Sequence, residues 1–536
     1  MNVIPKLQKQ TILSNSKCDI KSFSNIFIDD CFNYSKNFII SIYEKALNKK
    51  FENKKGEIEY LYDNQIKQEG YILSIDENNI LVKASDCNGA IYATQTIRQL
   101  FNFDLDITSA NCSKIEDYPE MSWRGLLYDE ARHFFGKEHT KKLIDIMSLH
   151  KLNVLHWHLS DNEGWRIEIK KYPLLTEIGS KRKESQINGW FSTKTDGIPH
   201  EGFYTQDDIK EIINYAKERG IMIIPEIDMP GHFAAASAAY SYLTCRDLKR
   251  PVPWYFGGSI PNKKLKMHDW NRSACVANEK TMQFMKDVVG EVIDLFNVPY
   301  FHIGGDEAPV GEWTKCPKCK KLMEDNKFTN PRQLQAYFIN EVNKFIQTKN
   351  CRLIGWNEIL KGDYPDKSII VQYWTPQPDY KVNKHLESGG EIIISKHKYF
   401  YFDMPYSMYN LKNTYNFNPK KIKTVNNKYL EQIKGIEGAV WTEWIPSKEK
   451  FDFQLHPRMQ ALSEVAWNNN DKNFDEFLTR LQDFNLLLQK HNIIGATNKV
   501  NHKIHLCKRK YIVTKWFNGD QNIEYKMNLN ELNKNK

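Results

Sequence analysis

The stretch YFHIGGDEAP, Tyr300–Pro309, joins a short apolar run to two glycines and an adjacent pair of carboxylates. The run Tyr300–Ile303 is typical of a buried strand, because it is short, aromatic and followed at once by glycine. The stretch has neither the pattern of a phosphate-binding loop nor metal-ligand spacing. Asp306 and Glu307 are therefore predicted to lie side by side at the end of a strand.

The same alternation of apolar run, polar loop and amphipathic helix repeats from about Pro119 onward. Eight such runs predict a (β/α)₈ TIM barrel, an α/β fold in which strands and helices alternate. Two connections follow the pattern less well: Asn357–Ser368 is short and interrupted by proline, and Tyr401–Gly435 is mostly loop. The eight predicted strands are Trp123–Leu127, Val154–Leu159, Met222–Ile227, Tyr300–Ile303, Leu353–Gly355, Ile369–Gln372, Glu391–Ser395 and Ile436–Trp441.

Residues 1–118 are predicted to form a separate, non-catalytic α+β sandwich domain. Apolar residues alternate on both sides of a turn at 76–79, as in a hairpin, and a helical stripe begins after Gly89. The barrel is assigned to residues 119–495. The C-terminal extension, residues 496–536, is rich in lysine and asparagine, and its sequence assigns it no role.

The composition is that of a soluble globular protein, with 41% hydrophobic and 26% charged residues and a net charge of +9 over 536 residues. No basic stripe lies in a recognisable module, so no nucleic-acid partner is expected. The N-terminus MNVIPKLQKQ lacks an apolar signal core, and no apolar run is long enough for a membrane span. A cytoplasmic location is expected, with secretion as the alternative if a leader has been removed.

Because active sites of barrels lie at the carboxyl ends of the strands, the residues that follow the eight runs should converge. This set is dense in carboxylates and tryptophans. Trp356, Trp374 and Trp441 end three strands and could stack on the apolar face of a sugar ring, although each could instead fill the core. Glu307 suits a general acid, since burial and the charge of Asp306 should both raise its pKa. The pair could alternatively cap the following loop.

Four motifs resemble the β-N-acetylhexosaminidases of glycoside hydrolase family twenty. They are HIGGDE at 302–307, HWHLSD at 156–161, EIDMPGH at 226–232 and RGLLYDEARHF at 124–134. The resemblance extends over roughly 69–467. It implies retaining exo-hydrolysis of terminal β-linked N-acetylglucosamine or N-acetylgalactosamine, in which the substrate's own acetamido oxygen forms an oxazolinium intermediate. It implies no cofactor and no metal.

The resemblance also implies a role for each site residue. Glu307 would be the acid/base, and Asp306 would hold the acetamido N–H. The remaining positions would bind substrate: Arg132 the 3- and 4-hydroxyls, Asp161 and His232 a polar relay behind the acid, Tyr401 the acetamido oxygen, Asp403 and Glu443 outer hydroxyls, and Trp356, Trp374 and Trp441 the aromatic walls. Of the neighbouring tyrosines, Tyr399 and Tyr406 compete with Tyr401 for its role. Asn357 and Tyr128 depart from the usual pattern of the family at positions that should not touch the reacting centre, and Arg124 is expected to be structural.

Several alternatives remain open at this stage. One is a conventional glycosidase with Glu443 or Glu358 as a second, separated carboxylate; another is an inactive, lectin-like barrel. Cys316 and Cys319 form a single CxxC pair without a second pair at knuckle spacing, so no zinc site is expected and the ten cysteines are interpreted as free thiols. The expected partner is an oligosaccharide or glycoconjugate; sugar preference and a homodimer are left open.

Overall fold

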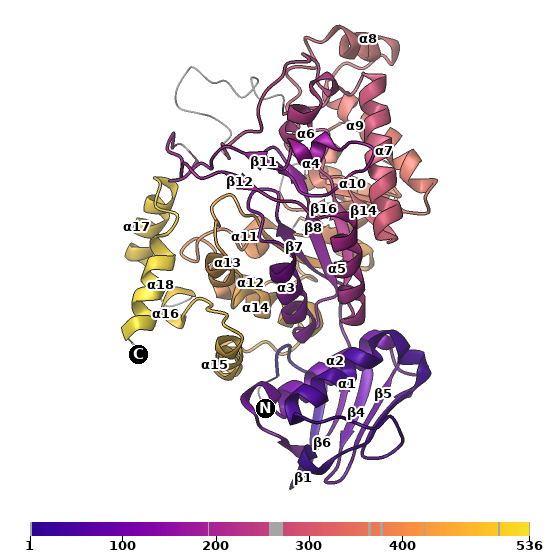
Figure 1. Ribbon diagram of the computed structural model, residues 1–536, viewed down its shortest axis with the longest axis vertical. Helices are drawn as coiled ribbons and strands as arrows, with labels where there is room; N and C mark the ends of the chain where they lie inside the picture. The colour runs from indigo at the N-terminus through magenta and orange to yellow at the C-terminus, as the bar shows by residue number, and fades with distance from the viewer. Residues whose placement is uncertain are drawn as a thin grey trace.

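The computed structural model describes residues 3–190, 192–256, 272–362, 366–375, 379–422, 424–501 and 504–534. Figure 1 shows a sheet-containing N-terminal unit below a larger barrel, with the C-terminal helices along one flank of the barrel. Within the described residues, no helix combines the length and the apolar character needed to cross a membrane.

The N-terminal unit is a six-stranded sheet in the order β1-β6-β4-β5-β3-β2, with helices on one face. The predicted hairpin is present as β4 (Tyr71–Ile75) and β5 (Ile80–Ala84), and the predicted helix is α2 (Cys87–Leu100). The other strands are β1 (Lys9–Asp19), β2 (Ile26–Ile28), β3 (Ile58–Tyr62) and β6 (Ser109–Asp117), and α1 is Asn33–Leu47. Alternate strand residues such as Leu73 and Val82 are buried with Ile91 and Ile97 of α2, which explains the pattern in the sequence.

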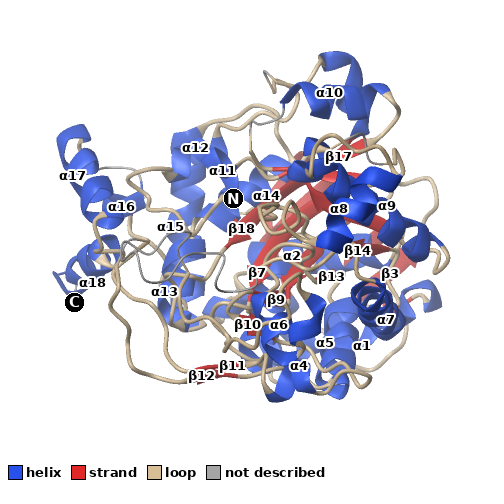
Figure 2. Cartoon of the chain, turned by 90° about the horizontal axis from the view of Figure 1, so that it is seen from above, coloured by secondary structure: helices blue, strands red, loops and turns tan. Residues whose placement is uncertain are grey.

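The second unit is a closed barrel of eight parallel strands, which confirms the predicted fold class. Figure 2 shows the strands at the centre of the molecule, surrounded by helices. Each predicted apolar run overlaps one strand. In barrel order these are β13 (Met222–Glu226), β14 (Tyr300–His302), β15 (Arg352–Trp356), β16 (Ile370–Tyr373), β17 (Glu391–Ile394), β18 (Ile433–Val440), β7 (Trp123–Asp129) and β8 (Val154–His158).

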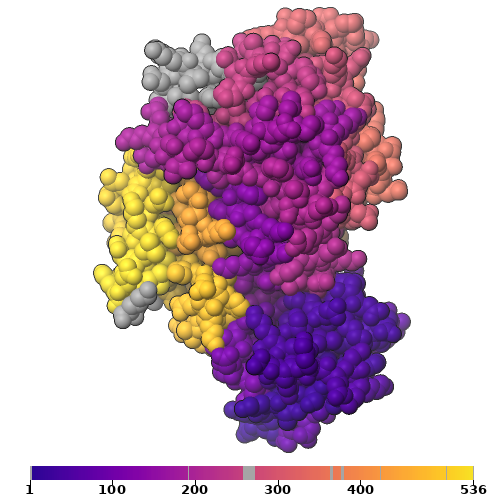
Figure 3. Space-filling model, viewed as in Figure 1, coloured from indigo at the N-terminus to yellow at the C-terminus, as the bar shows by residue number. Residues whose placement is uncertain are grey.

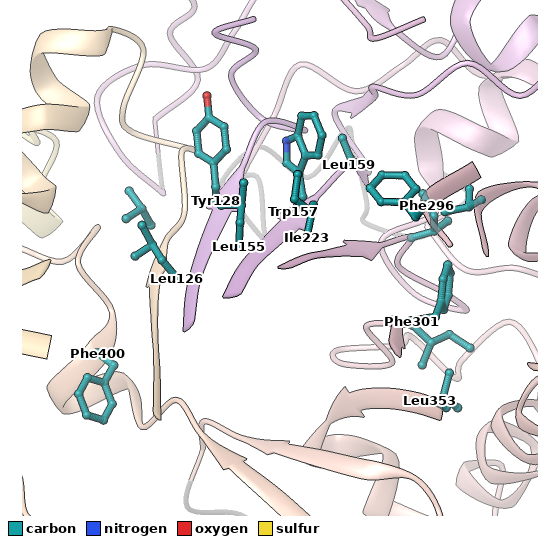
Figure 4. Close-up of a cluster of buried hydrophobic side chains, with 14 of the residues drawn as sticks. Leu126, Tyr128, Leu155, Trp157, Leu159, Ile223, Phe296, Phe301, Leu353 and Phe400 are labelled. Carbon is teal, nitrogen blue, oxygen red and sulfur yellow. The ribbon is translucent and has the colours of Figure 1, made fainter. Parts of the chain in front are cut away.

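Long amphipathic helices cover the barrel and bury its outward-facing strand residues. Figure 4 shows part of this layer, including Leu126, Leu155 and Phe301. Thr205 and Asp208 form a complete capping box at the start of α5. The main helices are α3 (Lys137–Leu149), α5 (Gln206–Glu218), α7 (Glu279–Phe296), α9 (Arg332–Gln347), α10 (Asp379–Glu387), α14 (Arg458–Trp467) and α15 (Phe474–Lys490).

The interior of the barrel changes in character along its axis, because inward-facing residues alternate with outward-facing ones. Its lower layer is apolar and includes Val154, Ile224 and Ile354. One step higher, ionisable side chains replace them: His156, Glu226 and His302 are all buried and lie close together. The upper layer is aromatic and contains the three tryptophans of the strand ends. Ionisable and aromatic side chains in the barrel interior therefore lie toward the carboxyl ends of its strands.

The two irregular connections agree with the sequence. A 3-10 helix, η6 (Asn357–Lys361), follows β15, and the rest of that connection includes residues 363–365, which lie outside the described part of the chain. Between β17 and β18, the described residues form the short elements α11 (His397–Phe400), α12 (Leu411–Tyr415) and η7 (Asn427–Gln432). These short elements leave the loop that carries Tyr401 and Asp403 at the mouth of the barrel.

The C-terminal extension folds into helices against this loop. In the space-filling view the extension covers one flank of the barrel (Figure 3). Its elements are α16 (Asn498–Asn501), α17 (Leu506–Phe517) and α18 (Ile523–Lys534). The buried Glu524 carboxylate accepts hydrogen bonds from the backbone N–H groups of Tyr406 and Ser407, each at 2.7 Å. The extension thus supports the segment that follows Asp403, a contact that its composition did not predict.

Candidate active site

The carboxyl ends of the barrel strands surround one cavity of about 420 Å³. Residues that are far apart in the sequence converge there, as the strand-end rule requires. The structure brings together ten of the eleven predicted site residues: Arg132, Asp161, His232, Asp306, Glu307, Trp374, Tyr401, Asp403, Trp441 and Glu443.

Trp356 is the exception, and its predicted role as a cavity wall is corrected. Its side chain is only 1% exposed, and its indole N–H donates to Glu226 Oε1 at 3.0 Å. The ring packs 5.8 Å from that of Trp441, between centroids. The buried Glu226 carboxylate needs donors, so the indole turns downward to supply one and becomes the layer beneath the cavity.

The backbone around the two glycines explains how adjacent carboxylates both reach the cavity. Strand β14 ends at His302, and Gly304 and Gly305 follow with φ values of +66° and +84°. A Cβ at Gly304 would lie 2.0 Å from Asp228 Oδ1, so a side chain is excluded there. Glu307 itself has φ +44°, an uncommon conformation for a residue with a side chain. The chain therefore turns sharply, and the strand alternation no longer separates Asp306 from Glu307.

His232 lies between the two acids and connects them to a buried network. Its Nε2 atom is 3.6 Å from Asp306 Oδ2 and 3.6 Å from Glu307 Oε2. On the other side of the ring, Nδ1 is hydrogen-bonded to Asp161 Oδ1 at 3.0 Å. Asp161 Oδ2 in turn contacts Arg132 Nη2 at 2.7 Å and His158 Nε2 at 2.9 Å. The predicted relay of Asp161 and His232 behind Glu307 is thus a continuous set of contacts.

The pKa values of the pair differ from the prediction made for Glu307. The neighbouring His232 lowers the pKa of Glu307 below its usual value. Burial raises the pKa of Glu307, as expected, but the contact with His232 outweighs this effect. Burial raises the pKa of Asp306 well above its usual value, with a further contribution from the charge of Asp228. Of the two acids, Asp306 therefore binds a proton more readily in the free protein.

Asp228 and Glu163 are further acids of this cavity to which sequence reasoning assigned no role. Burial raises the pKa of Asp228 to about 7, and its Oδ1 accepts a hydrogen bond from Gly305 N at 3.1 Å. Glu163 also reaches a pKa of about 7, again through burial and through the charge of Asp161. The motif EIDMPGH contained the signal for Asp228, since this residue follows directly on the strand that carries Glu226. The site concentrates carboxyl groups that burial keeps partly protonated.

A wall of aromatic rings faces the two acids. Trp374 and Tyr401 are stacked, with ring centroids 5.7 Å apart and an interplanar angle of 10°. Trp441 lies 6.2 Å from Tyr401 and also lies beneath the guanidinium of Arg132, at 5.2 Å. Asn357 holds this wall from behind, because its Oδ1 atom accepts a hydrogen bond from Trp374 N at 3.1 Å. The wall offers a flat surface of the kind on which the C–H face of a sugar ring packs.

The structure separates Tyr401 from its two competitors. Only Tyr401 of the three lines the cavity. The Tyr406 hydroxyl is buried and donates to the backbone oxygen of His456 at 2.8 Å, while Tyr399 packs against Phe417, 5.0 Å between centroids. Of these three tyrosines, Tyr401 is therefore the one that a ligand in the cavity can contact.

Several buried polar atoms in the cavity have no hydrogen-bond partner among the described residues. Among them are Asp306 Oδ1, His232 Nε2, Trp374 Nε1 and Asp403 Oδ1. Buried polar atoms without partners are rare in folded proteins and indicate that a ligand or water completes them. These four atoms combine donors and acceptors around one volume, as the hydroxyl and amide groups of a sugar would require.

The structure also locates the other residues considered from sequence. Glu358 does not line the cavity: its Oε2 atom accepts from Glu307 N at 3.1 Å and contacts Lys361 Nζ at 2.6 Å. His158 and His302 are buried beneath the cavity. Trp190, Phe256, Arg272, His397 and Met404 also line the cavity.

A (β/α)₈ barrel with paired carboxylates, a fixed arginine and stacked aromatic rings at its strand ends has the features of the glycoside hydrolase class. Comparisons with known proteins identify the family. Residues 121–470 match the description "Glycosyl hydrolase family 20, catalytic domain", and residues 1–118 match "Glycosyl hydrolase family 20, domain 2". The chain belongs to glycosyl hydrolase family 20.

Curated relatives and solved structures agree with this assignment. A beta-hexosaminidase of Porphyromonas gingivalis is 34% identical over 80% of this chain, and one of Vibrio furnissii is 32% identical over 73%. The chain spans 54% and 64% of the lengths of these two relatives. The structure of a GH20 exo-β-N-acetylglucosaminidase of Vibrio harveyi, in complex with N-acetylglucosamine, has a TM-score of 0.81 and 28% identity, covering 92% of this chain and 78% of that one. A β-N-acetylhexosaminidase of Bacteroides fragilis has a TM-score of 0.80 and 27% identity, covering 94% and 99%.

Proposed function

We propose that this protein is a β-N-acetylhexosaminidase that removes terminal, non-reducing β-linked N-acetylglucosamine or N-acetylgalactosamine from oligosaccharides or glycoconjugates. The observation that carries the proposal is the adjacent pair Asp306–Glu307, which faces one cavity across from the stacked rings of Trp374 and Tyr401. Family membership and the names of the relatives support it.

The two carboxylates have different tasks in a substrate-assisted reaction. The carbonyl oxygen of the substrate's acetamido group attacks the anomeric carbon, and the bond from that carbon to the leaving oxygen breaks. Glu307 delivers its proton to the leaving oxygen, which departs with the bonding electron pair. Asp306 accepts a hydrogen bond from the acetamido N–H and offsets the positive charge of the cyclic oxazolinium. The Tyr401 hydroxyl donates a hydrogen bond to the acetamido oxygen. The exposed position of Glu307 suits contact with the leaving group, and the buried Asp306 suits the acetamide.

The second half of the reaction reverses these proton movements. Glu307, now a carboxylate, takes a proton from a water molecule as that water attacks the anomeric carbon. The bond between this carbon and the acetamido oxygen breaks, and the acetamide is restored. Two displacements at the same carbon retain its configuration.

Substrate binding would exchange the proton between the two acids. A sugar in the cavity covers Glu307 and removes water from it, which raises its pKa. The acetamido N–H at the same time gives Asp306 a hydrogen-bond donor, which favours its ionised form. The pair holds one proton both before and after substrate binds. In the free protein this proton can therefore be on Asp306, because binding transfers it to Glu307.

Arg132 and the aromatic wall would hold the sugar in place. Asp161, Asp129 and Glu163 surround the arginine at 2.7, 3.3 and 3.4 Å, which fixes its guanidinium before substrate arrives. Trp374 and Trp441 would contact the apolar faces of the ring. A rigid, preformed site of this kind lowers the entropic cost of orienting the substrate.

Two chromogenic glycosides that differ only at the 2-position test the proposal. The β-N-acetylglucosaminide should be hydrolysed, and the β-glucoside should not, because it has no acetamido oxygen to act as nucleophile. Comparable hydrolysis of both would instead support a conventional glycosidase with a second catalytic carboxylate. Of the two candidates, Glu443 and Glu358, only Glu443 lines the cavity. Binding of N-acetylglucosamine without hydrolysis of either would support a lectin-like protein.

A further inference from the structure

Four cysteines from separate parts of the sequence lie together beside the catalytic loops. Cys245 follows the 3-10 helix η4 (Ser241–Leu243), Cys275 precedes α7, and Cys316 and Cys319 stand at the start of α8 (Pro317–Asp325). The four sulfur atoms all lie within 4.8 Å of one another. Cys275, Cys316 and Cys319 are buried and Cys245 is partly buried. The sequence concealed this group, because only Cys316 and Cys319 are close along the chain.

The distances between the sulfur atoms match those of a tetrahedral metal site. The Sγ atoms of Cys245 and Cys319 are 3.8 Å apart, those of Cys275 and Cys319 are 3.8 Å apart, and those of Cys275 and Cys316 are 3.9 Å apart. Four thiolates at about 2.3 Å from a zinc ion in tetrahedral array are separated from one another by about 3.8 Å. A disulfide would need sulfurs at about 2.05 Å. The spacing therefore fits one shared ion better than any pairing of the thiols.

The backbone holds the three cysteine-bearing segments in position. Cys275 N donates to Leu243 O at 2.8 Å, which joins the segments that carry Cys275 and Cys245. Pro317 occupies the first turn of α8 directly after Cys316, so the CxxC pair lies on one helical turn and both sulfurs face the same side.

We propose that Cys245, Cys275, Cys316 and Cys319 bind one zinc ion in a closed, structural tetrathiolate site. With four protein ligands the ion has no open position, so its role is to stabilise structure and not to activate water. The proposal replaces the expectation from sequence that no zinc site exists, and it does not depend on the proposed function.

The zinc site would fasten the loop after β13 to the loop after β14, which carry His232 and the acid pair. The contacts between these loops are already close. Trp313 Nε1 donates to Ala274 O at 2.9 Å, and Ala274 N donates to Pro230 O at 2.9 Å. A Cβ on Gly231 would lie only 2.9 Å from the backbone oxygen of Asp306. The ion would thus lie behind the active site and position it through the backbone.

Metal analysis of the full-length chain, purified without chelator, tests the proposal. We expect about one zinc per chain in the wild type, and loss of most of it in Cys319→Ser. Cys351→Ser is the matched control, because Cys351 is buried but stands outside the group, and this variant should keep its zinc. Iron in place of zinc, or a metal-free wild type in which these cysteines form disulfides, would overturn the proposal.

A second measurement uses only the wild type, in case Cys319→Ser does not fold. Stepwise titration with an organomercurial should release the zinc in proportion to the modification of four thiols, and the apparent Tm should fall. Removing the metal with a strong chelator should lower the Tm by several degrees, and zinc but not magnesium should restore it. A Tm that is the same with and without bound metal would contradict a structural role.

Discussion

Both ends of the barrel bury charged side chains, but the two ends differ in how completely these side chains are paired. At the lower end, facing the N-terminal unit, Arg124 binds Glu69 at 2.8 Å and Lys151 binds Asp117 at 2.7 Å. Arg124 also donates to the backbone oxygens of Lys151 and Met121, at 2.8 and 2.7 Å. At the upper end, Asp306 Oδ1 and Asp403 Oδ1 have no hydrogen-bond partner among the described residues. These lower charges are paired within the protein, whereas each of these two upper carboxyl groups keeps an oxygen atom without a partner among the described residues.

The pKa values show the same contrast for two carboxyl groups. Burial raises the pKa of both Glu69 and Asp306, but Arg124 outweighs burial at Glu69 and lowers its pKa below the usual value. Among the described residues no guanidinium pairs with Asp306; the charges of Asp228 and Glu307 raise its pKa further, and His232 offsets this only in part. Buried charges that are paired contribute to a unique structure, whereas buried charges without partners indicate where a ligand binds. Substitutions at the upper end should therefore change the kinetics, and those at the lower end the stability.

The largest kinetic effect is expected for Glu307→Gln. Loss of a general acid should lower kcat/KM by about 10²–10⁴-fold on substrates with poor leaving groups, which need protonation. Aryl glycosides with acidic phenol leaving groups should lose much less, because the phenolate departs without a proton. Steady-state kinetics over a series of leaving groups checks this. Equal losses across the series would show that Glu307 is not the acid.

Asp306→Asn should lower kcat/KM by about 10²–10³-fold on all of these substrates, because charge stabilisation at the oxazolinium is lost. The pH profile of the residual activity should change as well. In the wild type, the raised pKa of Asp306 lets the pair hold its one proton to higher pH, and activity is lost when that proton leaves. In the variant only Glu307 can hold the proton, and its pKa is lowered. The alkaline limb of kcat/KM should therefore move to lower pH.

The control for this shift is Asp294→Asn, an exposed carboxylate on α7 that pairs with Lys349 away from the cavity. Its profile should coincide with that of the wild type. An alkaline limb that stays in place in Asp306→Asn would mean that the two acids do not share a proton.

Tyr401→Phe should have a smaller effect, a loss of about tenfold in kcat/KM, as expected for one hydrogen bond to a group that gains charge. Tyr401 stacks on Trp374, and phenylalanine preserves that contact. Tyr399→Phe is the matched control and should leave kcat/KM unchanged. A loss in Tyr399→Phe as large as that in Tyr401→Phe would contradict the assignment of the acetamido donor.

Arg124→Met should leave kcat/KM essentially unchanged and act on stability alone. Removing one partner of a buried pair strands the charge of Glu69 and should lower the free energy of unfolding by about 3–5 kcal/mol. The double variant Arg124→Met/Glu69→Gln should recover part of this loss. For comparison, Lys50→Met at the exposed Lys50–Glu44 pair should change the free energy by less than about 1 kcal/mol. Denaturant unfolding followed alongside activity distinguishes these outcomes; a kinetic defect in folded Arg124→Met would erase the contrast between the two ends.

Periodicity was enough to predict the barrel and the convergence of its strand ends. Apolar runs such as Val154–Leu159 are determined by local burial, and the parallel barrel brings their ends together whatever the loops between them. The same logic located Asp306 and Glu307. It could not show how deep a side chain lies: Trp356 is at a strand end, but the buried Glu226 draws its indole below the cavity.

Other features depend on contacts between segments that are distant in sequence. The pKa of Glu307 follows from His232, which belongs to another strand-end loop and lies 3.6 Å away. Sequence proximity to Asp306 indicated the opposite direction. The group of Cys245, Cys275, Cys316 and Cys319 was missed for the same reason, because spacing rules recognise only ligands that are near one another along the chain.

The central claim is that the substrate's own acetamido oxygen is the nucleophile, supported by Asp306 and followed by proton delivery from Glu307. The most direct test is kcat/KM for a series of aryl glycosides whose N-acetyl group carries none, one, two or three fluorine atoms. Fluorine withdraws electrons from the carbonyl oxygen, so the rate should fall steeply with each added atom. A rate that stays the same across the series would contradict the claim, because a carboxylate of the enzyme would then be attacking the sugar.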